Sequence, residues 1–199
     1  MAAAMRGSVR SAVLLALLAS ADVAVAQSVA GRITQEGAPV ADAVVYLEGA
    51  NAAPVATPPA RATMDQRDLR FVPPLLVIAR GTTVDFTNSD DIQHNVFSPS
   101  SVARKFDLGT YGPGAVRSIT FDQAGEAVIL CNIHMEMEAR ILVLEQPYFA
   151  KTSADGRYRI DDVRPGQYTL KVWREKPLAI SRSAAVGAGV TTVDLALPD

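Results

Sequence analysis

Apolar and polar residues alternate over short stretches through most of the chain. The segment TTVDF places Val84 and Phe86 on one face, and RSITF does the same with Ile119 and Phe121. A period of two is typical of a strand with one buried face. Apolar residues nowhere recur at helical spacing over three turns, so the pattern predicts an all-β chain without a long helix.

Two short apolar runs, AVIL at 127–130 and RILVL at 140–144, have the length of strands. They flank the motif CNIHMEM at 131–137, which is therefore predicted to be a loop between two strands. The stretch SPSSVARKFDLGTYGPG at 98–114 shows neither period and is predicted to be irregular, with room for one helical turn.

The two ends of the chain also read as strands. Residues 29–49 predict two strands around a turn at Glu36-Gly37, and residues 153–173 predict strands on both sides of Pro165-Gly166. Residues 51–60 contain three prolines, as a linker would. The alternating apolar residues of the C-terminal part are Tyr158, Ile160, Tyr168, Leu170, Val172, Val193, Leu195 and Leu197.

Neither end has enough strands to close a core alone, but together they make one small Ig-like β-sandwich. Residues 31–47 and 155–170 resemble the carboxypeptidase-regulatory-like or transthyretin-like family, in which such stretches lie close in sequence. The resemblance implies that a second domain is inserted into a loop of this sandwich. The predicted parts are 1–26, a signal peptide; 27–58 and 148–199, the two pieces of the sandwich; and 59–147, the inserted domain.

The first 26 residues have the features of a secretory signal peptide. Arg6 and Arg10 precede the apolar stretch SAVLLALLAS, and small residues allow cleavage after Ala26. That stretch is too short for a membrane span, which needs about 20 residues. We therefore expect a periplasmic or secreted protein without a membrane anchor.

Charge and cysteine usage narrow the function. A net charge of −2 with both signs mixed gives no indication of a nucleic-acid partner. The chain has one cysteine, Cys131, which cannot form an internal disulfide. An unpaired thiol in an exported chain is buried, forms a disulfide with another molecule, or binds a ligand such as a metal.

The neighbours of Cys131 favour a metal. His134 and Met137 follow it in the order C-x-x-H-x-x-M, and the only other histidine is His94 in DDIQHNVFS. One thiolate, two imidazoles and a thioether are the donors of a blue copper site. Zinc is the main alternative, with a carboxylate or water as fourth ligand, but it seldom uses a thioether.

Residues 73–98 and 121–145 carry the strand and loop pattern of the cupredoxins, and the sequence resembles plastocyanin- and amicyanin-like domains there. This resemblance implies a Greek-key β-sandwich with one type 1 copper, held by His94, Cys131, His134 and Met137. It further implies that Asn95 ties the His94 loop to the loop after Cys131.

The chain departs from that family beside the site. Many relatives have a proline where this chain has Met135, so two methionines compete for the axial position, and the spacing favours Met137. Glu136 and Glu138 add acid near the loop. The neighbouring aspartates 90 and 91 are predicted to be solvated loop carboxylates.

The predicted function is that of an exported, non-enzymatic electron carrier that cycles between Cu(I) and Cu(II), with redox partners docking near His134. Two alternatives remain open. One is copper storage or delivery by the same ligands, and the other is a structural or interaction β-sandwich with an accessory metal site.

Overall fold

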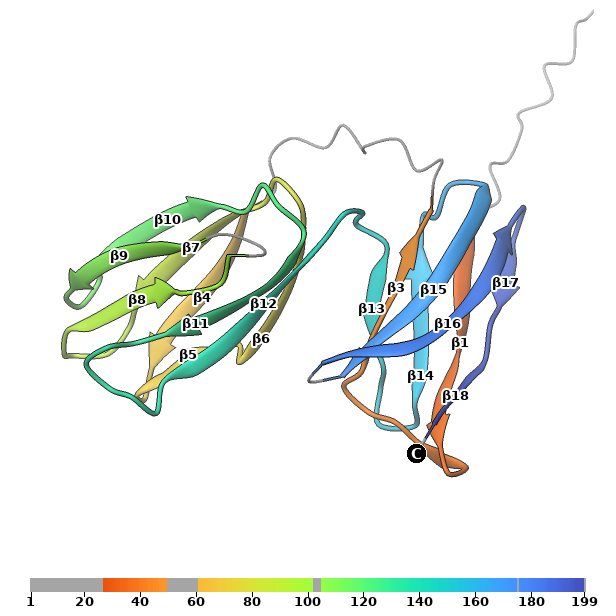
Figure 1. The fold of residues 1–199 in the computed structure, drawn as a ribbon, viewed down its shortest axis with the longest axis horizontal. Coiled ribbons are helices and arrows are strands. Elements are labelled where there is room, and N and C mark those ends of the chain that lie inside the picture. Colours follow the sequence, from red (N-terminus) through yellow and green to blue (C-terminus); the bar gives the residue numbers. More distant parts are fainter. Residues whose placement is uncertain (1–26, 50–60, 102–104, 175, 199) are drawn as a thin grey trace, which may run out of the picture.

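The computed structural model describes residues 27–49, 61–101, 105–174 and 176–198. All regular structure in these ranges is β-strand, so the all-β prediction is confirmed. The strands form two β-sandwiches that lie side by side (Figure 1). The predicted signal peptide at 1–26 lies outside the described residues, and within them no helix has the length and apolarity needed to cross a membrane.

The central sandwich is built from a four-stranded sheet in the order β10-β7-β4-β5 and a five-stranded sheet in the order β6-β12-β11-β8-β9. Its strands are β4 (Arg61–Arg67), β5 (Arg70–Val72), β6 (Leu75–Ala79), β7 (Thr83–Asn88), β8 (His94–Ser98), β9 (Phe106–Tyr111), β10 (Val116–Thr120), β11 (Gly125–Leu130) and β12 (Glu138–Leu144).

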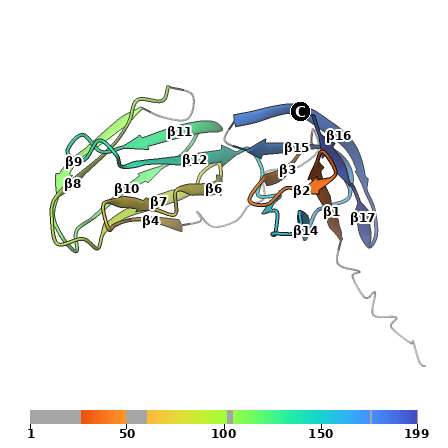
Figure 2. The same cartoon turned by 90° about the horizontal axis from the view of Figure 1, so that it is seen from below.

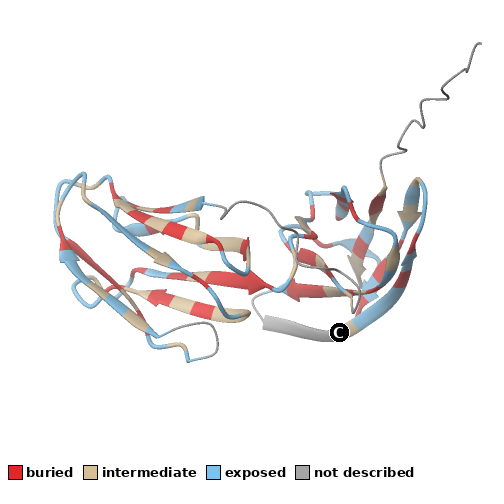
Figure 3. Cartoon of the chain, turned by 90° about the horizontal axis from the view of Figure 1, so that it is seen from above, coloured by how far each residue is buried: buried red, intermediate tan, exposed pale blue. Residues whose placement is uncertain are grey.

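The alternation of apolar residues fills the core of this sandwich. Val84, Phe86 and Phe121 are completely buried between the two sheets, as their spacing predicts. Along β7 in particular, buried positions alternate with partly accessible ones, and such red and tan bands are visible in Figure 3.

The prediction that 98–114 is irregular was wrong for part of that stretch, because β9 pairs with β8 there. Phe106 and Leu108 pack against the core, and the next core side chain is Tyr111 rather than the residue at 110. A shift of register interrupts the pairing of β8 with β9, and Gly109 has a φ of +71°. This bulge breaks the period of two, which hid the strand from the sequence pattern.

The outer sandwich combines strands from both ends of the chain. One sheet has the order β14-β1-β17, with β2 and β18 also paired to β1, and the other has the order β13-β3-β15-β16. The strands are β1 (Ser28–Gln35), β2 (Ala38–Pro39), β3 (Val44–Glu48), β13 (Phe149–Lys151), β14 (Arg157–Asp161), β15 (Gly166–Arg174), β16 (Lys176–Val186), β17 (Val190–Thr192) and β18 (Leu195–Leu197).

The predicted turn at Glu36-Gly37 is confirmed, since both residues have positive φ and the turn joins β1 to β2. The chain then crosses to the opposite sheet, where β3 pairs with β13 and β15. Val29 pairs with Ile160, so strands from before and after the central sandwich share a sheet.

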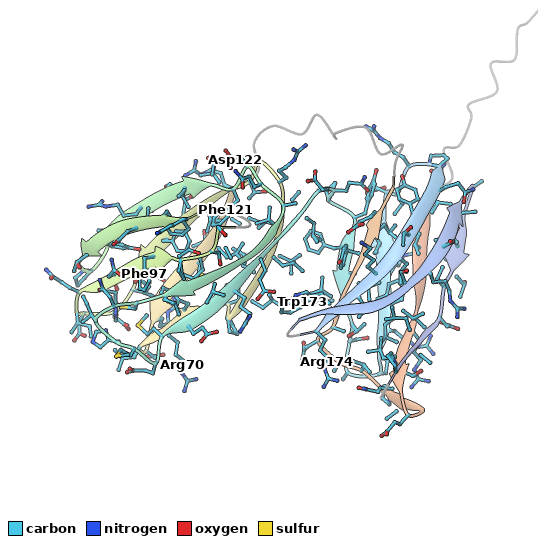
Figure 4. The ribbon with its side chains drawn as sticks, in the orientation of Figure 1. Arg70, Phe97, Phe121, Asp122, Trp173 and Arg174 are labelled. Carbon is cyan, nitrogen blue, oxygen red and sulfur yellow. The ribbon has the colours of Figure 1, made fainter. Side chains whose placement is uncertain are left out.

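The two sandwiches contact each other through an apolar interface. Strand β12 is buried on both faces, because Ile141 faces the central core while Leu142 and Leu144 face the outer sandwich. Trp173 covers them from β15 and is labelled in Figure 4 on the side of the outer sandwich that faces the central one. The view from below in Figure 2 shows β12 reaching the side of the outer sandwich that holds β3 and β15.

Candidate metal centre

The predicted ligands come from two neighbouring strands of one sheet. His94 is the first residue of β8, and Cys131 directly follows β11, which pairs with β8 through Leu130 and Phe97. His134 lies in the loop from β11 to β12. One imidazole nitrogen of each histidine and Sγ of Cys131 all lie within 4.8 Å of one another.

The loop 131–137 is closed by its own backbone. The N–H of Met137 donates to the carbonyl of His134 at 3.0 Å, and the N–H of Cys131 donates to the carbonyl of Met137 at 3.3 Å. The N–H of His134 points at Sγ of Cys131 at 3.5 Å. These bonds close the C-x-x-H-x-x-M segment into a compact loop between β11 and β12.

The two imidazoles face each other through their Nδ1 atoms, which are 3.0 Å apart. The rings lie edge to face, at 64°. His94 is completely buried, whereas His134 keeps part of its ring accessible. His134 is therefore the more accessible of the two histidines.

A carboxylate holds the far side of the buried imidazole. Oδ2 of Asp90 lies 2.7 Å from Nε2 of His94, and the same carboxylate accepts the backbone N–H groups of Asp68 and Leu69. Partial burial opposes ionisation of Asp90, but the hydrogen bonds from Leu69, Asp68 and His94 outweigh it and hold the pKa of its carboxyl below its usual value.

The prediction of two solvated carboxylates was thus wrong for Asp90, although Asp91 is exposed. Only its position four residues before His94 hinted at the contact, and that spacing has no special meaning in a loop. The loop between β7 and β8 turns the side chain of Asp90 back onto the imidazole of His94. Only the tertiary structure shows this contact.

Asn95 contacts Cys131 through its main chain. Its backbone N–H donates to Sγ of Cys131 at 3.5 Å, while its side-chain amide donates to Oδ1 of Asp107 on β9 at 2.9 Å. The tie to Cys131 therefore runs through the main chain, and the side chain fastens β8 to its neighbour β9. The same region holds three consecutive buried residues, His94, Asn95 and Val96.

The two methionines have opposite environments. Met137 is 1% exposed and belongs to the same buried cluster as Cys131. Met135 is 89% exposed, and Ile133 and Ile92 are also exposed. The thioether of Met137 is thus the one held inside the sandwich with the thiol.

A buried pair behind the ligands was not found from the sequence. Tyr111 pairs with His94 across β8 and β9, and Nε2 of Gln66 donates to its hydroxyl at 2.8 Å. Burial raises the pKa of the Tyr111 phenol above its usual value. This neutral hydrogen-bonded pair backs the strand that presents His94.

The donor set fits copper. Two imidazole nitrogens, one sulfur that is a thiolate when it binds, and a buried thioether nearby combine soft and borderline donors, which suit both Cu(I) and Cu(II). Zinc sites are built from thiolate, imidazole and carboxylate instead.

Comparisons with known proteins agree with this donor set. Residues 59–144 match the family model described as copper binding proteins, plastocyanin/azurin family. Residues 143–193 match the model described as polysaccharide lyase family 4, domain II. That second match names another family than the carboxypeptidase-regulatory-like one, which stays a prediction. A comparison with curated proteins found no match.

Several solved structures are similar to part of the chain. A purple cupredoxin from Nitrosopumilus maritimus is 22% identical over 41% of this chain and 98% of its own, with a TM-score of 0.38. A reduced amicyanin variant is 20% identical over 49% of this chain and 98% of its own, with a TM-score of 0.40. A copper-containing nitrite reductase from Thermus scotoductus SA-01 is 28% identical over 57% of this chain but 28% of its own, with a TM-score of 0.42.

The family match and the convergence of His94, Cys131 and His134 identify the central sandwich, residues 59–144, as a copper-binding cupredoxin domain of the plastocyanin/azurin family.

Proposed function

We propose that the chain is an exported type 1 copper protein that carries single electrons between redox partners. The observation that carries this proposal is the convergence of two imidazoles and one thiol within 4.8 Å, with His94 and Cys131 held in place by hydrogen bonds from neighbouring residues. Copper bound there supplies a one-electron couple between Cu(I) and Cu(II).

The protein holds two of the proposed ligands in place through hydrogen bonds of its own. His94 is held by Asp90, and Cys131 receives N–H groups from Asn95 and His134. Such contacts orient ligands and tune the bound metal. Because the ligands have little freedom to rearrange, a change of oxidation state costs little reorganisation, which favours electron transfer.

In this proposal Nδ1 of His94, Sγ of Cys131 and Nδ1 of His134 would hold the copper, and the thioether of Met137 would add a weaker fourth donor. Burial supports Met137 over Met135 for this role, since a residue that is 89% exposed does not face the core. The sulfur of Cys131 binds as a thiolate, so copper uptake releases its proton.

Electrons enter and leave, in this proposal, through the accessible edge of His134. Ile133, Met135 and Ile92 are exposed apolar residues in the two loops that carry the ligands, and Glu136 adds a negative charge. The outer sandwich lies at the other end of β12, about 20 Å along the strand from Met137, so it leaves this face open.

The test is a copper titration of the purified protein. Cu(II) should produce an intense thiolate-to-copper absorption in the visible, which Cys131→Ser abolishes and His94→Ala abolishes or strongly alters. Met137→Leu should keep the colour and shift the reduction potential. A protein that takes up copper but stays colourless would contradict the proposal of a type 1 site.

Two further measurements on the copper-loaded protein, electron self-exchange and copper release, distinguish a carrier from a storage or delivery protein. A carrier should exchange electrons rapidly with itself and release copper slowly to a chelator. Rapid copper release with poor electron self-exchange would favour storage or delivery. Full partner binding by the metal-free Cys131→Ser variant would favour an interaction module.

We further propose periplasmic or secreted localisation, with cleavage of the signal peptide after Ala26. Mass spectrometry of the mature protein from an expressing cell should give the mass of a chain that begins at Gln27. A protein that stays inside the cell with residues 1–26 still attached would contradict the proposed localisation.

A further inference from the structure

We infer that Asp90 is a positioning residue that fixes the proton of His94 on Nε2, aims Nδ1 at the metal and lowers the reduction potential of the bound copper. The effect on the reduction potential rests on the function proposed above. The position of the proton on His94 is a property of the metal-free protein and does not depend on that function.

The geometry assigns the proton. An ionised carboxylate only accepts hydrogen bonds, so the 2.7 Å contact with Oδ2 of Asp90 requires Nε2 of His94 to carry the hydrogen. In the neutral ring Nδ1 is then left with its lone pair, and it points at Nδ1 of His134, 3.0 Å away. His94 is completely buried, so solvent does not compete for either nitrogen.

The carboxylate itself has little freedom to move. Its Oδ1 accepts the N–H of Asp68 at 2.6 Å and its Oδ2 accepts the N–H of Leu69 at 3.2 Å. Both residues form the turn from β4 to β5 and have positive φ values of 53° and 58°. Two adjacent N–H groups of one turn thus hold the Asp90 carboxylate, and that carboxylate holds the imidazole of His94.

The loop that carries Asp90 is fastened from the other side. Oδ1 of Asn88 accepts the N–H of Asp90 at 3.0 Å, and Nδ2 of Asn88 donates to the carbonyl of Ile92 at 2.9 Å. The negative charge is therefore built into a fixed position beside the buried ligand.

A hydrogen bond to a fixed anion makes the imidazole a stronger donor through Nδ1. A stronger donor stabilises Cu(II) more than Cu(I), because the higher charge benefits more from donated electron density. Losing an outer partner of this kind typically lowers metal affinity about 10- to 100-fold. For a one-electron couple, each tenfold loss of Cu(II) affinity relative to Cu(I) raises the potential by about 59 mV.

The experiment compares Asp90→Asn with Asp91→Asn. Both remove one negative charge from neighbouring positions, but Asp91 is exposed, so it controls for long-range charge. Asparagine keeps a carbonyl oxygen for the turn, which protects folding. We expect Cu(II) affinity to fall at least tenfold and the potential to rise by about 59 mV or more in Asp90→Asn, and only slightly in Asp91→Asn. Equal shifts in the two variants would overturn the inference.

A second measurement needs neither copper nor a substitution. Nitrogen-15 NMR of the metal-free protein should show His94 protonated at Nε2, with a slowly exchanging proton. Protonation at Nδ1 alone would refute the assignment. If copper gives no thiolate band in the wild-type protein, the proposed function fails, while this NMR result still decides the Asp90–His94 link.

Discussion

The indole Nε1 of Trp173 donates to Oε2 of Glu126 at 3.2 Å, across the boundary between the two sandwiches. Glu126 also forms an ion pair with Arg140 of β12. Glu126 lies near the start of β11, and Cys131 directly follows the end of that strand. The outer sandwich is thus fastened to the strand that presents the thiol, but about 16 Å from it along the strand.

The first prediction concerns this interface. Trp173→Ala should lower the free energy of unfolding by about 3–5 kcal/mol, because it empties a large site that is 3% exposed. Trp173→Phe keeps most of the packing and should cost about 1 kcal/mol for the lost hydrogen bond. Chemical denaturation measures both. The copper absorption of the folded Trp173→Ala protein should be unchanged, and a bleached site would show that the interface shapes the ligand loop.

The second prediction separates the methionines. Met137→Leu should shift the reduction potential, because the thioether that is buried with Cys131 is lost. Met135→Leu should leave the potential unchanged, because that side chain is 89% exposed. Voltammetry of the copper-loaded variants gives both values, and a shift confined to Met135→Leu would reverse the assignment of the axial ligand.

The third prediction concerns acid stability and Asp65 of β4. Partial burial opposes its ionisation, but hydrogen bonds from Thr87 and Ser89 and the charge of Arg67 hold the pKa of its carboxyl below the ordinary 3.8. Because the folded pKa is the lower one, ionised Asp65 stabilises the fold above pH 3.8, and this contribution is lost as pH falls through the folded pKa.

Asp65→Asn should therefore flatten the loss of stability of the metal-free protein below about pH 4. Thr87→Val removes one donor and brings the folded pKa of Asp65 closer to its unfolded value, so the loss of stability in acid should be smaller than in the wild type. Denaturant unfolding at a series of pH values measures the effect. Identical profiles for all three proteins would show that the network around Asp65 does not control acid stability.

The fourth prediction concerns the interrupted sandwich. Nε2 of Gln146 donates to the carbonyl of Gly49 at 2.9 Å, and the N–H of Leu47 donates to the carbonyl of Tyr148 at 3.0 Å. The chain therefore leaves and re-enters the outer sandwich at one place. Replacing residues 59–147 by a short turn should leave a folded sandwich with cooperative unfolding and the circular dichroism of β-sheet.

That shortened chain should be less stable than the whole protein, because it uncovers Trp173 and its apolar neighbours. Residues 59–147 made alone should bind copper with the same visible absorption as the whole chain. An unfolded remainder would mean that the outer sandwich needs the central one to complete its core.

Much of the fold was readable in the sequence wherever one face of a strand is buried and the other is solvated. The alternations at Val84 and Phe86 and at Tyr168 and Leu170 put all four residues in cores. The strand Phe106–Tyr111 was missed because its bulge breaks the period. Strand β12 is buried on both faces, so residues 141–144 form an apolar run without alternation and were predicted as a strand from the length of that run alone. Such strands carry no period-two signal.

By itself, the sequence determined that the chain is built of strands and that its candidate copper ligands are Cys131, His134, Met137 and His94, because residue type and short spacing are local properties. Tertiary structure alone decided that Asp90 grips His94, that the backbone of Asn95 points at the thiol and that Met135 faces solvent. Those contacts depend on which loops and strands meet in space, and no pattern of neighbouring residues records that.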